Sequence, residues 1–438
     1  MDDRFEWLSD FGPCICVDGE KVDVLTEPKE FYAALSSRCK TAKDRVILAS
    51  LYIGTGDMER ALVTSLQDSL ADNKTLRVRV LLDACRGSRG SPNSRAILLP
   101  LLSEKGVRIA LYRTPMLSGW LRKLVPERWN EIFGLQHVKI YVFDNDVVMT
   151  GANLSKDYFT NRQDRCVLFR GSKQLADFCE EFVDAVSSFS HGLNPDDSLT
   201  APEISLEDSK TCHDARKVVE SMLDSWRNRS GPLSDTRVWP LVQMGQLGVD
   251  RDRKATSTLL SRASSKLQIA SGYFNLTKDY EFRMISNPNA SYDVLMAHPT
   301  TNGFFDAQGI SGMIPHAYTF LASHFFNRIT ANNCSRIRLF EYLRPKWTFH
   351  GKGLWMLREN EALTFVGSPN FGYRSVERDL ELQLAVVTTN VRLRKQLDRE
   401  CNKLFSYGVP VTSEVFAAPE RYVPYWVRLA IRTVKHFF

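Results

Sequence analysis

Short apolar runs alternate with amphipathic stretches along the first part of the chain. Runs that are apolar at consecutive or alternating positions indicate strands, and apolar residues at helical spacing indicate helices. The pattern predicts strands over residues 45–53, 76–83, 107–112, 146–150 and 165–169, and helices over residues 27–39 and 57–69. Strands that alternate with helices in this way are typical of α/β layering.

The second part of the chain repeats this order. Predicted strands cover residues 266–274, 292–297, 335–340 and 380–387. The end of the first strand in each part even shares its letters, Ala49-Ser-Leu-Tyr52 against Ala270-Ser-Gly-Tyr273. We therefore predict an α/β fold of two pseudo-symmetric halves, each a mixed sheet flanked by helices, with one site at their interface.

Composition places the divisions of this duplicated unit. A stretch rich in Asp, Ser and Pro covers residues 187–211, and a helical pattern follows over 212–228. We predict an N-terminal half over residues 1–190, a linker and connecting helix over 191–228, and a C-terminal half over 229–420. Residues 421–438 form a separate amphipathic tail. The apolar positions at helical spacing in it are Val427, Ala430, Ile431, Val434 and Phe438.

Three segments outside the repeat combine aromatic, aliphatic and basic residues. Two are inserts, at residues 115–133 and 304–329, and the third is the tail. Such segments are either helices packed on the core or surfaces that face lipid, since interfacial helices carry aromatic anchors beside Lys and Arg. The lipid-facing interpretation places four side chains at the membrane: Trp120, Leu124, Trp129 and Trp426.

One stretch holds the reactive side chains, and it occurs twice. The first copy reads His137-Val-Lys139-Ile-Tyr-Val-Phe-Asp144 and is followed by Gly151-Ala-Asn153. In a strand, alternation would put His137, Lys139 and Tyr141 on one face and core residues on the other. A histidine that can attack or move a proton, beside a lysine that neutralises phosphate oxygens, suits phosphoryl chemistry without a metal.

The second copy is less complete. It reads His350-Gly-Lys352, with Gly367-Ser368-Pro-Asn370 downstream, but Leu357 stands where the first copy has its aspartate. Each copy also has a downstream acid, Asp164 in the first and Glu381 in the second. Together the two copies would supply a nucleophile and a separate general acid.

Charge and cysteine content restrict the partners and the compartment that can be expected. The chain of 438 residues has a net charge of +6, which suits phosphate-bearing ligands or an anionic membrane surface and does not require nucleic acid. Its nine cysteines have no zinc-site spacing and no disulfide-framework density, which favours a reducing compartment. The N-terminus reads as neither a signal peptide nor a transit peptide, so we expect either a cytosolic protein or a targeting segment that is absent from this sequence.

The two motif copies resemble those of the phospholipase D superfamily, whose signature is HxKxxxxD followed by a Gly/Asn turn in each half. The resemblance implies a two-step reaction with His137 as nucleophile, because its copy is intact, and His350 as general acid and base. Because His and Lys, and not an acidic cluster, face the phosphate, we expect no cofactor and no protein-bound metal, and any stimulation by Mg²⁺ would arise through the CDP group of the substrate. The phosphoryl oxygens would be held by Lys139, Lys352, Asn153, Asn370 and Ser368.

Supporting roles follow from the same resemblance. Asp164 and Glu381 would fix the histidine tautomers, and Asp144, although grouped with the catalytic residues, would mainly support the turn after the strand. Arg86 and Arg89, in a basic loop over residues 86–93, could contact a substrate phosphate or simply be solvated. This loop and Gly54-Thr-Gly56 fit neither common nucleotide-binding pattern, so an ATP site is poorly supported.

Within the superfamily, the chain looks like the eukaryotic phosphatidylglycerophosphate synthases over nearly its whole length. The stretches that carry this likeness are Leu48–Gly56, Gln136–Lys139, Thr150–Ser155, Thr348–Trp355 and Gly367–Ser375. The likeness implies transfer from CDP-diacylglycerol to glycerol 3-phosphate by a peripheral protein on the matrix side of the mitochondrial inner membrane. A serine phosphatidyltransferase, a phospholipase D-type phosphodiesterase and an inactive lipid-binding scaffold are the alternatives.

Overall fold

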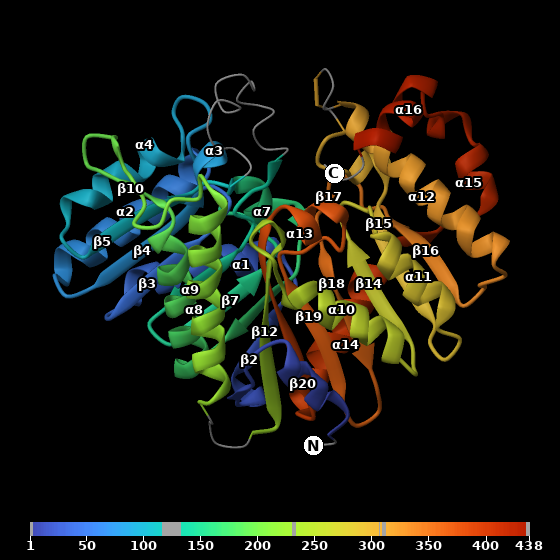
Figure 1. Ribbon diagram of the computed structural model, residues 1–438, viewed down its shortest axis with the longest axis horizontal. Coiled ribbons are helices and arrows are strands. Elements are labelled where there is room, and N and C mark those ends of the chain that lie inside the picture. The colour runs from blue at the N-terminus through green and yellow to red at the C-terminus, as the bar shows by residue number, and fades with distance from the viewer. Residues whose placement is uncertain (1–2, 116–132, 230–233, 306, 309–311, 435–438) are drawn as a thin grey trace.

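Two β-sheets lie side by side in this computed structural model, and helices cover their outer faces (Figure 1). The structure describes residues 3–115, 133–229, 234–305, 307–308 and 312–434. Strands β7 (Asp146–Thr150) and β19 (Ala362–Gly367) are in contact where the sheets meet. The two halves therefore share an extended internal boundary.

The first sheet is parallel in its centre and antiparallel on both sides, since β10 also pairs antiparallel with β5 and with β11. Strands β3 to β5 pair in parallel, and β6, β7, β9 and β2 continue the sheet with antiparallel pairing. In sheet order the strands are β11 (Leu199–Thr200), β10 (His191–Leu193), β5 (Val107–Tyr112), β4 (Arg77–Asp83), β3 (Arg45–Ala49), β6 (Ile140–Phe143), β7, β9 (Cys166–Phe169) and β2 (Val22–Leu25).

The second sheet repeats this plan with its own strands. Strands β14 to β16 pair in parallel, and β18, β19, β20 and β12 continue antiparallel. In sheet order the strands are β1 (Ile15–Val17), β12 (Thr236–Met244), β20 (Leu380–Thr388), β19, β18 (Lys352–Leu357), β14 (Leu267–Ser271), β15 (Tyr292–Ala297), β16 (Ile337–Tyr342) and β21 (Gly408–Pro410), with β13 (Val249–Asp250) paired to β12. The predicted α/β class with two pseudo-symmetric halves is confirmed.

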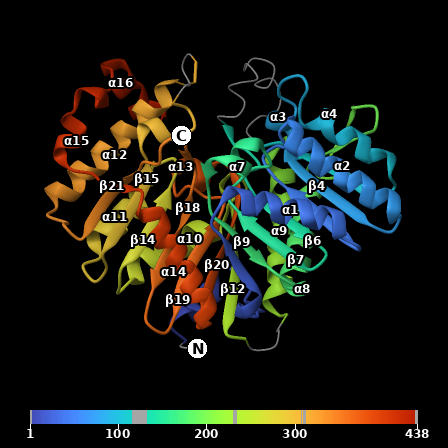
Figure 2. The same ribbon diagram turned by 180° about the vertical axis from the view of Figure 1, so that it is seen from behind.

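Helices pack on both faces of the sheets, and Figure 2 shows α1 and α14 on the side hidden in Figure 1. The longer helices are α1 (Pro28–Thr41), α2 (Asp57–Asp72), α8 (Lys173–Ser188), α9 (Ser209–Arg227), α10 (Arg251–Arg262), α11 (Lys278–Ser286), α12 (Ile314–Ala331), α14 (Val391–Phe405) and α16 (Tyr425–Val434). The short ones are α3 (Ala84–Gly87), α4 (Ser94–Leu98), α7 (Lys156–Thr160), α13 (Tyr373–Glu377) and α15 (Ser413–Ala417).

The largest core cluster takes apolar side chains from both sheets. Val142 and Met149 of the first sheet and Leu382 and Leu384 of the second belong to it, and all four are buried. Burying apolar area contributes roughly 25 cal/mol per Å². A core shared in this way stabilises each half only when the other is present.

Short backbone pairings cross from one half to the other just beside each motif. Strand β8 (Arg162–Gln163) pairs in parallel with β17 (Thr348–Phe349), and the N–H of His350 donates to Gln163 O at 2.8 Å. In the matching place the N–H of His137 donates to Leu380 O at 2.8 Å. Each crossing puts the acid that follows in one half beside the histidine of the other.

These crossings change one prediction. Strand β6 begins only at Ile140, so His137 and Lys139 lie in the segment before the strand and not within it. Tyr141 on the predicted reactive face is buried in the core of the first half. The motif segment leaves the sheet because its backbone pairs with Leu380 of the other half.

The predicted division of the chain stays a prediction, with one feature near the N-terminus that bears on it. Strand β1 pairs with β12 of the second sheet, whereas β2, a few residues later, pairs with β9 of the first. Phe5 and Leu8 also pack in the core cluster of the second half. The first residues of the chain therefore lie across both halves.

Candidate active site

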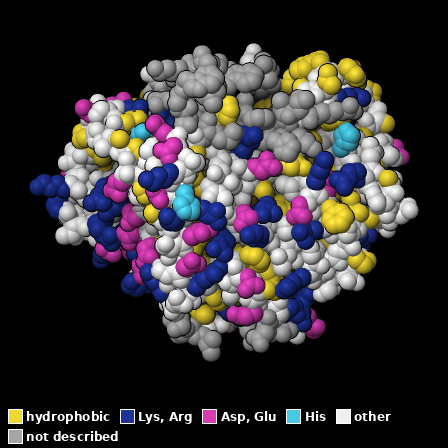
Figure 3. Space-filling model, in the orientation of Figure 1, with side chains coloured by type: hydrophobic (Ala, Val, Ile, Leu, Met, Phe, Trp, Pro, Cys, Tyr) yellow, Lys and Arg dark blue, Asp and Glu magenta, His cyan; other side chains and the backbone are white. Residues whose placement is uncertain are grey.

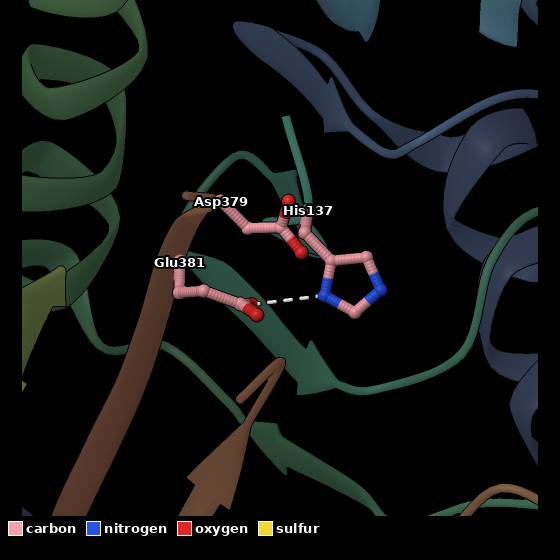
Figure 4. Close-up of side chains that lie close together, drawn as sticks. All are labelled: His137, Asp379 and Glu381. Atoms are coloured by element: carbon pink, nitrogen blue, oxygen red, sulfur yellow. Dashed lines mark hydrogen bonds and ion pairs between the residues drawn. The ribbon is translucent and has the colours of Figure 1, made fainter. Parts of the chain in front are cut away.

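His137 lies beside two carboxylates of the opposite half, and one of them, Glu381, holds its ring (Figure 4). Its Nδ1 lies 2.9 Å from Oε2 of Glu381, and Asp379 is adjacent. An Nδ1–H that donates to Glu381 leaves the lone pair on Nε2, which has no hydrogen-bond partner within the described part of the chain. The tautomer that suits a nucleophile is thus the one that the surroundings favour.

His350 is held by an acid of the first half and by Lys352 of its own motif, whose Nζ lies 2.5 Å from Nδ1. Its Nδ1 lies 2.6 Å from Oδ2 of Asp164, whose carboxyl also accepts from Lys352 Nζ at 3.2 Å. The Nε2 of His350 lies 3.3 Å from the hydroxyl of Tyr158. The reactive nitrogen of His350 therefore has a neighbour that His137 lacks, which makes the two histidines unequal.

Both lysines of the motifs are fully buried beneath the histidines. Lys139 Nζ donates to His137 O and Lys352 Nζ donates to His350 O, each at 2.6 Å. Burial lowers the pKa of both lysines, well below the usual value for Lys139. Two cations in a dry site form a strong field for a phosphoryl group, because screening by water is weak there.

Burial also sets the protonation of the histidines and their acids. The pKa of His137 and of His350 is well below the usual value, first because both are buried and second because Lys139 and Lys352 repel a further charge. Burial raises the pKa of Glu381 to about 7, although Lys139 opposes this shift. Neutral imidazoles beside lysine cations suit nucleophilic attack on phosphorus.

The two asparagines of the Gly/Asn turns have different hydrogen-bond partners. Asn153 Nδ2 donates to the Tyr158 hydroxyl at 3.2 Å, and the backbone N–H of Asn370 donates to Ser375 Oγ. Each Oδ1 is buried and has no hydrogen-bond partner among the residues that the structure describes. Because a rotated amide exchanges oxygen and nitrogen, either residue can present a donor to a phosphoryl oxygen.

Ser368 has a different surrounding. Its hydroxyl donates to Leu382 O at 3.2 Å and accepts from the N–H of Leu382 at 3.1 Å. It also lies beside the carboxyl of Glu381, whose pKa it lowers. Ser368 is fully buried and therefore stabilises the backbone of strand β20 and the position of Glu381.

Asp144 lies away from the two histidines, at the turn between β6 and β7. Its φ is +53°, and its carboxylate accepts the backbone N–H groups of Lys43, Asp44 and Arg45. Its carboxylate thus joins the turn between β6 and β7 to the residues just before β3 and to the first residue of that strand. The residue shapes the fold around the motif, and a catalytic role for it stays a prediction.

The two arginines of the basic loop differ in position. The guanidinium of Arg86 lies 4.9 Å from the centre of the Tyr52 ring, and its charge lowers the pKa of Tyr273, an active-site neighbour. Arg89 lies in the turn after α3, where its N–H donates to Arg86 O at 3.4 Å. Arg86 therefore borders the site, and phosphate binding by either arginine stays a prediction.

The glycine loop after β3 encloses an acid. A Cβ on Gly54 would lie 2.5 Å from Oε1 of Glu59, and one on Gly56 would lie 2.8 Å from Oε2. The N–H of Lys156 donates to the same carboxyl at 2.5 Å. A buried carboxylate in this cradle disfavours a phosphate there, so the loop positions α7 beside the site.

The carboxylates near His137 also have metal-like spacing. One donor atom each from His137, Asp379 and Glu381 lies within 4.8 Å of the others. However, Asp379 Oδ2 is paired with Arg374 Nε at 2.9 Å, and Lys139 places positive charge beside Glu381. These cations favour orientation of the histidine over binding of a divalent ion, and metal independence stays a prediction.

Sequence reasoning missed several residues around the histidines. Asp379 and Arg374 lie beside His137, and Tyr158, Tyr273 and Arg162 lie beside His350. The repeat aligned Tyr273 with Tyr52 but assigned neither a role. Neither half alone shows that Tyr158 faces the histidine of the other.

The C-terminal tail has two apolar faces. Val423, Val427 and Ile431 pack against Ala317 in a small core cluster with α12. On the other face Tyr422, Tyr425, Trp426 and Leu429 are exposed, and apolar side chains gather over α16 in Figure 3. The apolar stripe predicted from helical spacing thus packs inward, while the aromatic side chains face out.

The structure does not test the other three predicted membrane-facing residues. Trp120, Leu124 and Trp129 lie outside the residues that the structure describes. None of the described helices is long and apolar enough to cross a bilayer.

Comparison with known proteins places this geometry in a family. The family model described as "Cardiolipin synthase, PLD-like domain" matches residues 35–185. The chain is 41% identical to the mitochondrial CDP-diacylglycerol–glycerol-3-phosphate 3-phosphatidyltransferase of Gallus gallus, over 99% of this chain and 86% of the relative. It is 33% identical to the Saccharomyces cerevisiae enzyme of the same name, over 95% of this chain and 88% of the relative.

A solved structure supports the fold. The phosphatidylserine synthase of Haemophilus influenzae superposes with a TM-score of 0.76 over 100% of this chain and 99% of that one, at 17% identity. This likeness concerns architecture alone, since identity is low. Identity to the chicken and yeast proteins over nearly the full length is what decides membership: the chain belongs to the CDP-diacylglycerol–glycerol-3-phosphate 3-phosphatidyltransferase family, on a phospholipase D-like fold.

Proposed function

We propose that this protein transfers the phosphatidyl group of CDP-diacylglycerol to glycerol 3-phosphate, giving phosphatidylglycerophosphate and CMP. This is the first committed step toward phosphatidylglycerol and cardiolipin. The observation that carries the proposal is the pair of buried His–acid contacts across the two halves, His137 with Glu381 and His350 with Asp164. It occurs in a chain about 40% identical to enzymes of that name.

The first step breaks the bond between the phosphatidyl phosphorus and the CMP oxygen. Nε2 of His137 forms a bond to phosphorus, and His350 gives a proton to the departing CMP. The anionic diphosphate raises the proton affinity of His350, which offsets the effect of burial. Lys139 and Lys352 neutralise the charge that develops on the phosphoryl oxygens.

The second step releases the lipid product. His350, now neutral, takes the proton of the acceptor hydroxyl, whose oxygen attacks phosphorus while the bond to His137 breaks. The carboxyls of Glu381 and Asp164 hold both rings through Nδ1 during the exchange, as orienting acids do in other catalytic groups. One histidine thus acts on phosphorus and the other only on protons.

A panel of acceptors tests this function against its alternatives. Metal-stripped protein is mixed with CDP-diacylglycerol and glycerol 3-phosphate, serine or water, and CMP release is followed with and without added Mg²⁺. We expect turnover with glycerol 3-phosphate. Turnover with serine alone would indicate a serine phosphatidyltransferase, turnover with water alone a phosphodiesterase, and no CMP with any acceptor a binding protein.

The acid side of the pH profile should depend on Glu381. The carboxylate form accepts the Nδ1–H of His137, and burial raises the pKa of this acid to about 7. The rate of single-turnover CMP release should therefore fall as the pH drops through about 7. In Glu381→Gln the rate should be lower by about 10²–10⁴-fold, and the fall in rate below about pH 7, the acid limb of the profile, should disappear. An unchanged acid limb in the variant would assign it to another group.

We also propose that α16 contacts an anionic membrane, on the matrix side of the mitochondrial inner membrane. Relatives are named mitochondrial. The exposed residues Tyr425, Trp426 and Leu429 lie beside exposed Arg428, a combination typical of interfacial helices. In Figure 1, α16 lies at the same end of the molecule as β17 and α13, which flank the site.

Replacing the outward side chains of α16 should weaken membrane binding without unfolding the helix. In a triple variant, Tyr425→Ser, Trp426→Ser and Leu429→Ser, the inward face toward α12 is kept. We expect binding to cardiolipin-containing liposomes to weaken at least about tenfold, since apolar area is lost from the interface. Phe282→Ser, which removes an equally exposed ring on α11, is the control. Equal binding by the triple variant and wild type would show that α16 is only a packing element.

A further inference from the structure

An aromatic wall borders His350. The rings of Tyr158 and Tyr273 meet the imidazole edge to face, with centres 5.1 Å and 5.3 Å away. Tyr318 stacks on Tyr273 at 5.5 Å with an interplanar angle of 19°. A wall of this kind excludes water. A charged group within it therefore interacts strongly with other charges, because water does not screen the interaction.

Arg162 is a cation within this wall. Its guanidinium lies 5.0 Å from the centre of the Tyr158 ring, and its charge contributes to the low pKa of His350. Nε donates to Thr348 Oγ1 at 3.1 Å, which fixes the side chain across the two halves. The side chain is only 15% exposed, so it is held in place and not solvated freely.

The guanidinium keeps capacity for a ligand. Nη2 lies 3.6 Å from Asp157, a long contact with a carboxylate that is 62% exposed. The guanidinium also has a side-chain hydrogen bond with Tyr158, a neutral partner. Because a guanidinium offers five donors in a planar fork, donors remain for an oxyanion.

An exposed glycine lies directly against this cation. A Cβ on Gly303 would lie 2.9 Å from Nη2 of Arg162 and 3.1 Å from the hydroxyl of Tyr273. Gly303 itself is exposed. Any larger residue would therefore occupy the point where the guanidinium and the phenol converge, and with glycine this chain places no side chain there.

The chemistry of the acceptor requires a cation in this region. The hydroxyl of glycerol 3-phosphate must reach His350 Nε2, and its phosphate lies only a three-carbon chain away. Lys139 and Lys352 are buried beneath the reacting phosphorus, where they donate to backbone oxygens. Arg374, on the side of His137, is paired with Asp379. Arg162 is the arginine placed beside the proton-transfer histidine.

We propose that Arg162, assisted by the Tyr273 hydroxyl, binds the phosphate of glycerol 3-phosphate and thereby selects a phosphate-bearing acceptor. The inference rests on the proposed function. A buried guanidinium left without its anion disfavours an acceptor that lacks phosphate, which makes such a contact a strong determinant of specificity.

Steady-state kinetics with two acceptors test this site. In Arg162→Gln we expect the KM for glycerol 3-phosphate to rise about 100-fold, because a charged partner is lost. The KM for CDP-diacylglycerol should stay within about twofold, and the preference for glycerol 3-phosphate over glycerol should fall by a similar 100-fold. Arg162→Lys keeps the charge but loses the fork, so its KM should rise about tenfold.

Two further variants test the role of Tyr273 and control for the loss of an arginine elsewhere on the protein. Tyr273→Phe should raise the same KM by about five- to tenfold while the cation stays in place. Arg170→Gln, which removes an exposed arginine paired with Asp23, is the matched control. Thermal unfolding of every variant shows whether its fold is intact.

The outcomes separate the two proposals. Wild-type protein that does not use glycerol 3-phosphate contradicts the proposed function. Wild type that uses it, with Arg162→Gln affecting glycerol and glycerol 3-phosphate equally, overturns the acceptor site alone. A rise in the KM for glycerol 3-phosphate in Arg86→Gln but not in Arg162→Gln would place the acceptor phosphate at Arg86 and overturn it as well.

Discussion

Replacing His137 by alanine should abolish turnover, with a loss on the order of 10⁵–10⁶-fold, as expected when a nucleophile is removed. Its Nε2 is the imidazole nitrogen without a partner among the described residues, while Glu381 fixes Nδ1. Without that nitrogen no bond to phosphorus can form in the first step. The variant should therefore release no CMP, even in a single turnover.

His350→Ala should fail at a different point. CMP is a good leaving group, so the bond to His137 can still form slowly without a general acid. The acceptor hydroxyl, however, has lost the base that takes its proton, which contributes about 10²–10⁴-fold. Rapid quenching should then detect close to one equivalent of CMP per enzyme, followed by very slow turnover.

An exposed histidine away from the site serves as the control for both histidine variants. His213→Ala changes an exposed histidine on α9 and should behave as wild type. A stoichiometric burst of CMP from the His137 variant, with none from the His350 variant, would reverse the two assignments.

Arg165→Met should cause the largest loss of stability among the substitutions considered. Arg165 is 1% exposed and pairs with both carboxylate oxygens of Glu400, at 3.0 Å and 2.9 Å. It also donates to Phe365 O and Thr364 Oγ1, and stacks on Trp355 at 3.8 Å. This cluster joins the first half to the second directly beside Asp164.

Removal of the arginine leaves Glu400 buried without its counter-charge. Breaking a buried pair in this way costs about 3–5 kcal/mol. The double variant Arg165→Met with Glu400→Leu removes both charges and should recover most of that loss. Lys173→Met breaks an exposed pair with Asp177 and should cost less than about 1 kcal/mol.

Chemical denaturation measures these differences. A single Arg165 variant within about 1 kcal/mol of wild type would show that the pair adds little to the fold, contrary to the burial argument. A double variant as unstable as the single one would show that the hydrogen bonds to Thr364 and Phe365, and not the unpaired charge, dominate the cost.

The repeat and the two His–Lys pairs could be predicted from the sequence because they are local. Apolar runs define strands such as β4 and β15, and the letters at His137 and His350 are read directly. The same locality explains the errors. Alternation assigned His137 to a strand, but its backbone pairs with Leu380, more than two hundred residues away.

The partners of each histidine could not be predicted for the same reason. Asp164 follows the first motif in sequence, yet it holds His350 of the second. Nothing in the spacing of one half shows that β8 crosses to β17, since the crossing depends on packing of both sheets. The role of Arg162 likewise emerges only once the other half brings Thr348 and His350 to it.

The sequence also could not show which face of the tail helix is exposed. Helical spacing identified Val427 and Ile431 as one apolar stripe, and the prediction of a lipid contact rested partly on it. Only the position of α12 reveals that this stripe is already buried. The side chains available to a membrane are instead Tyr425, Trp426 and Leu429, whose exposure depends on that packing.

In the proposed reaction, the phosphatidyl group is held covalently on His137 between the two steps. The most direct measurement is mass spectrometry of His350→Ala after mixing with CDP-diacylglycerol, first intact and then after proteolysis. We expect a phosphatidyl adduct, stable to alkali and labile to acid, on the peptide that contains His137. An adduct on a peptide without His137, or none on a variant that has released an equivalent of CMP, would contradict the account.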